Sequence, residues 1–194
     1  GLDQPIWMQY GLFVVNALAG DLGKSFVFSI PSIELILQRM PATLELALCA
    51  VTLSVILGIP LGMYAGYRPE SRTAKTIMAT SIAGFSLPTF WVGLMLIMIF
   101  AVELGWLPST GRGQLGQFLG IRSSLFTLDG LSHLVLPALN LALFNISLVI
   151  RLTRAGMREN MPMDYVKFAR AKGLSQNRVV FVHVMKNIMI PVVT

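Results

Sequence analysis

The sequence predicts an all-α, polytopic membrane protein, and three features carry that prediction. Hydrophobic residues make up 55% of its 194 residues and charged residues only 12%, whereas a soluble domain usually carries about 25% charged residues. Uncharged stretches recur at lengths that can cross a bilayer, which takes about 20 apolar residues. The basic residues lie between these stretches. A nucleic-acid-binding domain could also carry the net charge of +6, but it would not flank its basic face with spans of membrane length.

The first 40 residues are predicted to form an external segment with short interfacial helices. They contain only two short apolar patches, Gly11–Gly20 and Phe26–Ile33, and each is too short to cross the membrane. The Gly-Lys-Ser sequence at 23–25 is part of the phosphate-binding P-loop motif, but that motif also needs a glycine at position 18, which is leucine. We therefore expect an ordered turn here and no nucleotide site.

The first span is predicted at residues 42–66, where Pro41 opens a long uncharged run. Small residues recur at every fourth position, namely Ala50, Ser54, Gly58, Gly62 and Gly66. Helices in lipid associate through close backbone approach, so this stripe predicts a helix-packing face. The alternative is that the glycines only loosen the helix beside Pro60. Glu45 lies in the first turn, where a carboxylate is favoured, and is a candidate for lining a solute path.

Two further spans are predicted at residues 76–104 and 131–152, joined by a long loop rich in Gly, Ser and Thr. Pro88 lies inside the second span and should kink it, because proline removes a backbone hydrogen bond. Asn140 and Asn145 lie inside the third. Amides in a spanning helix usually hydrogen-bond a neighbouring helix, and these two are also candidates for the solute path. A fourth span is expected to begin near residue 187.

The distribution of Lys and Arg orients the spans, because cytoplasmic loops are enriched in these residues. Three of them lie in the short loop 68–75 and eight lie between residues 151 and 186, so both segments are predicted to be cytoplasmic. Residues 1–40 and 107–129 hold two each over greater lengths and are predicted to be external. All the loops agree with one topology.

The most charged segment, residues 164–178, follows the third span. It predicts a short amphipathic helix with Tyr165, Phe168 and Ala169 on one face, ended by a break at Gly173, and a second helical pattern from Gln176. Anchoring to the membrane surface would explain the basic residues. It would not explain the small residues, which allow close approach of another protein. We therefore expect this segment to dock on a partner and transmit rigid-body motion.

Several stretches resemble the permease subunits of ABC importers, and within these the dipeptide/oligopeptide/glutathione/nickel group. The main matches are YVKFARAKGLS at 165–175 and HVMKNIMIPVVT at 183–194, with shorter ones at 1–5, 20–23, 41–46 and 103–108. The resemblance covers essentially the whole chain. The general permease signature has Glu-Ala-Ala where this chain has Lys167, Phe168 and Ala169. A partner contact made by that glutamate therefore cannot be carried over.

The resemblance implies an ABC type-1 importer permease fold in residues 41–194, truncated to about three complete spans and the start of a fourth. It implies a bacterial inner-membrane location and, besides lipid, three kinds of partner: a second homologous permease, two cytoplasmic ATPases and an external solute-binding protein. No nucleic acid is implied. ATP and Mg would be used by the ATPases, so this chain is expected to catalyse no reaction and to bind no cofactor or metal.

The resemblance also identifies residues 164–176 as the coupling helix, which would seat in a cleft of an ATPase. Its contact residues would be Asp164, Tyr165, Ala169, Arg170, Ala171, Lys172 and Gly173. A bulky residue in place of Gly173 is expected to uncouple ATPase activity from solute uptake.

The alternative from another class is a secondary transporter or channel. Such proteins usually place ionisable residues near the bilayer midplane, whereas the second predicted span has none and the third has only His133, at its end. An intramembrane enzyme has less support, because the chain lacks the H-E-x-x-H and G-x-S-x-G motifs. The identity of the solute is left open.

Overall fold

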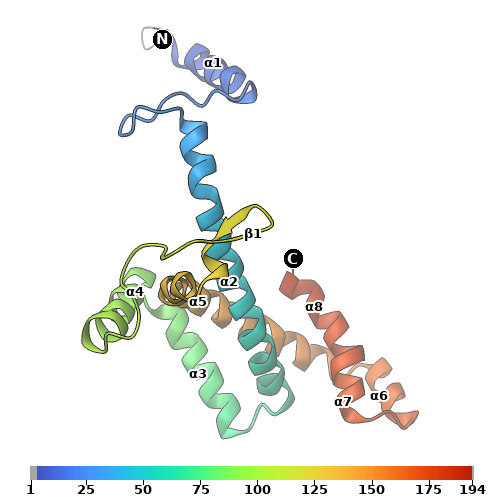
Figure 1. The fold of residues 1–194 in the computed structure, drawn as a ribbon. Coiled ribbons are helices and arrows are strands. Elements are labelled where there is room, and N and C mark those ends of the chain that lie inside the picture. The colour runs from blue at the N-terminus through green and yellow to red at the C-terminus, as the bar shows by residue number, and fades with distance from the viewer. Residues whose placement is uncertain (1–3, 194) are drawn as a thin grey trace. The chain divides into compact units, whose positions relative to one another are not determined.

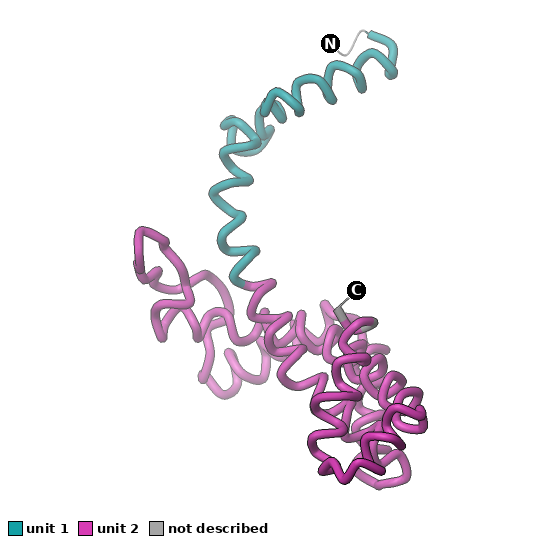
Figure 2. Tube along the Cα trace, turned by 90° about the vertical axis from the view of Figure 1, so that its right-hand side faces the viewer, with its two compact units in different colours: residues 1–45 teal, residues 46–194 magenta. Residues whose placement is uncertain are grey.

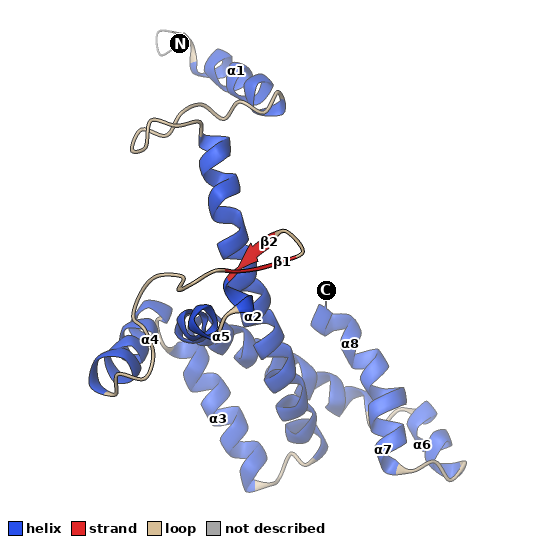
Figure 3. Cartoon of the chain, viewed as in Figure 1, coloured by secondary structure: helices blue, strands red, loops and turns tan. Residues whose placement is uncertain are grey.

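A computed structural model of the chain describes residues 4–193. These residues belong to two compact units, residues 1–45 and 46–194 (Figure 2). The elements are α1 (Ile6–Leu18), α2 (Ser32–Tyr67), α3 (Arg72–Ser86), α4 (Thr89–Leu96), η1 (Ile97–Glu103), β1 (Gly116–Phe118), β2 (Ile121–Ser123), η2 (Ser124–Phe126), α5 (Leu128–Asn160), α6 (Asp164–Ala171), α7 (Gln176–Arg178), η3 (Val179–Val184) and α8 (Met185–Val193) (Figure 3). The predicted all-α class is confirmed, with one small hairpin added.

The first unit contains α1 and the beginning of α2, joined by an ordered turn. The Asp21 carboxylate accepts a hydrogen bond from the Gly23 amide at 2.8 Å, and Lys24 pairs with Pro31 in an isolated antiparallel bridge. Helix α2 begins at Ser32, nine residues before the proline that the sequence predicts as its start. The apolar helical pattern extends back past Pro41, and Gln38 donates to Glu34 one turn earlier, at 3.2 Å.

The second unit is organised around α5, against which α3, α4 and α8 pack (Figure 1). Two apolar clusters form its core. One lies where α2 meets the middle of α5 and contains Ala50, Ala142, Ile146 and Ile150. The other joins the end of α5 to α6, η3 and α8 through side chains that include Met157, Val166, Val184 and Ile188.

The predicted second span is broken at Leu87 and Pro88. Both residues have extended backbone conformations, so α3 and the α4–η1 segment meet at a bend of 103°. The proline pushes the preceding residue out of helical geometry as well, and two successive extended residues turn the chain much further than a kink. Within residues 4–193, α2 and α5 are each long and apolar enough to span a membrane, and the bent pair makes a third if it crosses as one span.

Two helical segments extend beyond the predicted spans. Helix α5 continues to Asn160, past the basic residues that the sequence predicts as the end of its span. The next helical segment begins at Gln176, as the sequence predicts, and runs through η3 into α8, past the expected start of the fourth span near residue 187. In both places the helix is longer than its uncharged part, because helical hydrogen bonding continues outside the apolar region.

The loop before α5 contains a β-hairpin that the sequence does not predict. Strands β1 and β2 are antiparallel, with Phe118 opposite Ile121. The two residues between them, Leu119 and Gly120, have φ angles of +48° and +81°. Positive φ at both positions is typical of a type I′ turn, which usually uses Asn-Gly or Asp-Gly. Leucine in the first position gives no such signal.

Candidate functional site

The predicted coupling segment forms a separate helix, α6, tied to the end of α5. The Tyr165 hydroxyl donates to the Asn160 side-chain oxygen at 2.9 Å. The Asn160 amide in turn donates to the Gly156 carbonyl, one turn earlier in α5, at 3.0 Å. A movement of α6 is therefore resisted by a direct polar connection to the long helix.

Helix α6 buries a different face from the one the sequence predicts. Val166 and Ala169 are buried in the cluster with η3 and α8, whereas Phe168 is 62% exposed. At roughly 100° per residue, a face centred between Val166 and Ala169 leaves Tyr165 at its edge and Phe168 on the far side. The prediction that Phe168 shares a face with Ala169 is wrong. The burial of Ala169 also removes it from the surface that a partner could contact.

The exposed face of α6 combines an aromatic ring with positive charge. The Lys172 ammonium lies 4.5 Å from the centroid of the Phe168 ring, a cation–π geometry. Lys167 is paired with Asp164 at 2.8 Å, so its charge is locally balanced. Arg170 is exposed on the other side of the helix, roughly 160° from Phe168, so both sides of the exposed surface of α6 are positive. Such a face suits a groove with an acidic rim and an apolar floor.

Gly173 has a conformational role within the chain. Its φ is +79°, the left-handed conformation that favours glycine at the end of a helix. The Gly173 amide donates to the Arg170 carbonyl at 2.9 Å, and the Leu174 amide donates to the Ala169 carbonyl at 3.3 Å. These two bonds form a Schellman motif. An ideal Cβ at Gly173 would meet no described atom within 4 Å. Glycine is therefore favoured here by its backbone conformation and not by packing against the described residues.

The glycine stripe of α2 lies against α5. An ideal Cβ on Gly58 would lie 2.7 Å from a methyl carbon of Val149, and one on Gly62 would lie 2.6 Å from Cβ of Thr153. Gly66 meets Met157 in the same way. Ser54, at the start of the stripe, is buried and donates to the Ala50 carbonyl of its own helix at 2.6 Å. Any side chain on these three glycines would push the helices apart.

The two asparagine candidates for a solute path do not face one site, and the third candidate lies in a separate compact unit. Glu45 is buried and belongs to the first unit. Asn140 and Asn145 are both half-buried on α5, but five residues apart they point in directions that differ by roughly 140°. Asn140 faces α4: an ideal Cβ on Gly93 would lie 3.1 Å from its side-chain nitrogen. Only Asn140 lines a cavity between these helices.

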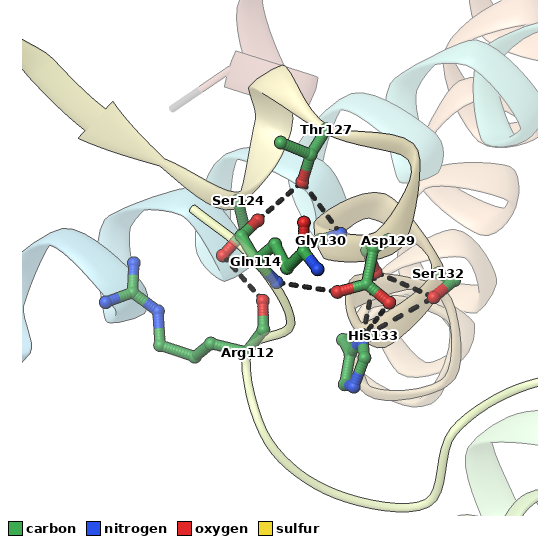
Figure 4. Close-up of polar contacts among 8 residues, drawn as sticks. All are labelled: Arg112, Gln114, Ser124, Thr127, Asp129, Gly130, Ser132 and His133. Atoms are coloured by element: carbon green, nitrogen blue, oxygen red, sulfur yellow. Dashed lines mark hydrogen bonds and ion pairs between the residues drawn. The ribbon is translucent and has the colours of Figure 1, made fainter. Parts of the chain in front are cut away.

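The loop before α5 is pinned to the first turn of that helix by polar contacts (Figure 4). The Thr127 hydroxyl accepts from the Gly130 amide at 2.9 Å and donates to the Gln114 carbonyl. The Asp129 carboxylate accepts from the Gln114 amide at 2.6 Å. His133 Nδ1 lies 2.8 Å from the Asp129 carbonyl. None of these contacts is predicted from the sequence, although a threonine just before an apolar helical pattern is a recognisable N-cap signal.

No metal site is present in the part of the chain that the structure describes, where no three His, Cys, Asp or Glu side chains come together. Cys49, the only cysteine, is half-buried on α2. The described geometry is that of packed helices, with α6 exposing a positively charged surface.

Comparison with known proteins decides the family. Residues 58–194 match the model of the binding-protein-dependent transport system inner membrane component. The chain belongs to this family. Together with its long apolar helices, this makes it a multi-pass protein of a bacterial inner membrane. The resemblance predicted from the sequence is confirmed.

Among curated relatives, the chain is 37% identical over 209 residues to the dipeptide transport system permease protein DppB of Escherichia coli (strain K12). It is 41% identical over 206 residues to the di/tripeptide transport system permease protein DppB of Pseudomonas aeruginosa (strain UCBPP-PA14). It is 39% identical over 195 residues to the oligopeptide transport system permease protein AppB of Bacillus subtilis (strain 168). Each match covers 100% of this chain but only 62%, 61% and 60% of the respective relative. The chain therefore spans about three fifths of the length of these relatives.

Proposed function

We propose that the protein is the membrane-spanning permease subunit of an ATP-driven importer of short peptides. The observation that carries the proposal is the combination of its family with the positive, aromatic face of α6. The named relatives are permeases of dipeptide, di/tripeptide and oligopeptide transport systems, which favours peptides over the other solutes of the resembled group. Transport requires this chain to form no covalent bonds, so its contribution would be the shape of the path and a conformational change.

In the proposed assembly, a second homologous permease completes the path and an external binding protein delivers the peptide. Two ATPase subunits on the cytoplasmic side bind ATP and Mg, and this chain binds no cofactor. Helix α6 would seat in a groove of one ATPase, with Phe168 and Lys172 against one wall and Arg170 against the other. Because α6 is hydrogen-bonded to α5 through Tyr165 and Asn160, closure of the ATPases would move α5 and the helices packed on it.

The direct test is transport by the assembled complex in proteoliposomes, with the full-length permease and its partners. We expect accumulation of radiolabelled alanyl-alanine that requires ATP and the binding protein. Accumulation driven by an ion gradient without ATP would instead support the secondary-transporter alternative. ATP-dependent accumulation of glutathione or nickel, with none of peptide, would contradict the proposed solute.

A further inference from the structure

The hairpin formed by β1 and β2 exposes apolar side chains at its tip (Figure 3). Phe118, Leu119 and Ile121 are 61%, 86% and 65% exposed. The Phe118 ring lies 5.7 Å from the ring of Phe126, centroid to centroid, and Phe126 is itself exposed. Contiguous apolar groups on a surface mark contact with another protein or with a membrane.

The two faces of the hairpin differ in polarity. Phe118 and Ile121 are directly opposite each other in the strand pairing, so their side chains lie on the same face. Gln117 and Arg122 form the next pair and lie on the other face, where both are exposed. A segment with one apolar face and a basic residue on the other has the composition of structures that lie at the boundary between lipid and water.

The turn places a leucine where its conformation and its exposure are both unfavourable in water. Leu119 has a φ of +48°, and a type I′ turn normally has asparagine, aspartate or glycine at this position, because a larger side chain resists positive φ. With 86% of Leu119 exposed, contacts with the described residues do not compensate for the strain. Burial of the side chain in lipid would offset both costs.

The base of the hairpin lies at the level of the apolar spans. Gln114, just before β1, accepts a hydrogen bond from Thr127, just before α5, so the hairpin is held beside the start of that helix. Leu125, just after β2, lines an apolar cleft together with Leu48 of α2 and Leu131 of α5. Leu48 and Leu131 both belong to predicted spans, so the hairpin is next to the bilayer that surrounds them.

We propose that the tip of this hairpin inserts into the leaflet on the predicted external side of the membrane. Phe118, Leu119 and Ile121 would lie among the acyl chains, and the Arg122 guanidinium would bind lipid phosphate groups from the polar face. Insertion would continue the contact that α2 and α5 already make with lipid, and it would fix the start of α5 at one depth. The ligand is the phospholipid surface, which the proposed transport function does not specify.

The test measures the depth of two positions in the full-length permease, assembled with its partners in nanodiscs of phosphatidylethanolamine and phosphatidylglycerol. Leu119→Cys and Gln117→Cys each carry a nitroxide, in a cysteine-free background that includes Cys49→Ala. Collisions of the nitroxide with oxygen, which concentrates among acyl chains, are compared with collisions with a water-soluble nickel chelate. We expect the oxygen-to-nickel ratio at position 119 to be several-fold higher than at 117, the matched control on the polar face.

A second comparison isolates the leucine from the fold of the hairpin. Leu119→Asn creates the Asn-Gly pair that type I′ turns prefer, so the hairpin should persist without its apolar tip. With the nitroxide at Ile121→Cys, we expect the oxygen-to-nickel ratio to fall several-fold in Leu119→Asn and to be retained in Leu119→Met. An unchanged ratio in Leu119→Asn would contradict insertion through this residue.

Two results at position 119 would overturn the proposal. An oxygen-to-nickel ratio equal to that at position 117 would show a tip that lies in water. Shielding of the nitroxide from both reagents would show that the tip docks on protein, either on the external binding protein when it is added or on the rest of the complex without it.

Discussion

The contact between α2 and α5 makes Gly62→Ala the most informative stability perturbation. The added Cβ would lie 2.6 Å from Cβ of Thr153 and 2.8 Å from the Ile150 carbonyl oxygen. Ordinary contacts of this kind begin at 3.4 Å, so the two helices must separate by roughly 0.8 Å, and neither obstructing atom can rotate away.

Overpacking of this kind costs about 1–3 kcal/mol. The better helix propensity of alanine returns up to about 1 kcal/mol, so we expect a net loss of roughly 1–2 kcal/mol. The matched control is Gly84→Ala in α3, whose new Cβ would meet only the Ser147 hydroxyl oxygen, at 3.1 Å. This single contact is much less severe than the 2.6 Å contact at Gly62, so the control should be near neutral.

The assay is thermal unfolding of the purified full-length permease in detergent, followed by circular dichroism. A loss of 1 kcal/mol lowers Tm by about 2–4 °C in chains of 150–250 residues and by less in longer chains, so Gly62→Ala should melt measurably below both the parent and Gly84→Ala. Equal melting temperatures for the two variants would refute the close packing of the glycine stripe on α5.

Two further predictions concern helix ends. Gly173→Val should destabilise the turn after α6 by about 1–2 kcal/mol, because a β-branched residue resists positive φ, whereas Gly173→Asn should cost less because asparagine tolerates positive φ. Hydrogen exchange of the α6 amides measures both effects. Equal exchange rates in the two variants would contradict the Schellman assignment. Thr127→Val removes the hydroxyl that caps α5 and should lower stability by about 0.5–2 kcal/mol, measured by thermal unfolding. The control for Thr127→Val is Thr80→Val, since the exposed Thr80 hydroxyl bonds only carbonyls of its own helix. If Thr80→Val melts at as low a temperature as Thr127→Val, the assignment of Thr127 as the N-cap of α5 is contradicted.

Periodicity made much of the helical architecture predictable. Small residues at every fourth position place Gly58, Gly62 and Gly66 on one side of α2, and the structure sets that side against α5. Pro88 marks the interruption between α3 and α4. Its 103° angle could not be read from the sequence, because the direction of a broken helix depends on long-range contacts. Among these are the stacking of Phe85 on Phe144 at 4.8 Å and the approach of Gly93 to Asn140.

The candidate site was predictable as a segment and less so residue by residue. The charge and the Gly-Leu-Ser break locate α6, but which face it buries depends on the apolar side chains of η3 and α8, which meet Val166. The polar contacts of Thr127, Asp129 and His133 join a loop to a helix start. Only the N-cap threonine has a local signal, because the other contacts depend on how the hairpin folds back.

The central claim, that α6 couples this chain to an ATPase, is tested most directly by the number of peptides transported per ATP hydrolysed in proteoliposomes containing Arg170→Glu. Arg170 is exposed and the substitution leaves the buried face of α6 unchanged, so the fold should persist. Reversing a charge in a docking interface should lower this ratio by about tenfold. Lys75→Glu makes the same charge change at an exposed residue of α3 and should leave the ratio unaltered. An unchanged ratio in Arg170→Glu, or an equal fall in Lys75→Glu, would contradict coupling through this helix.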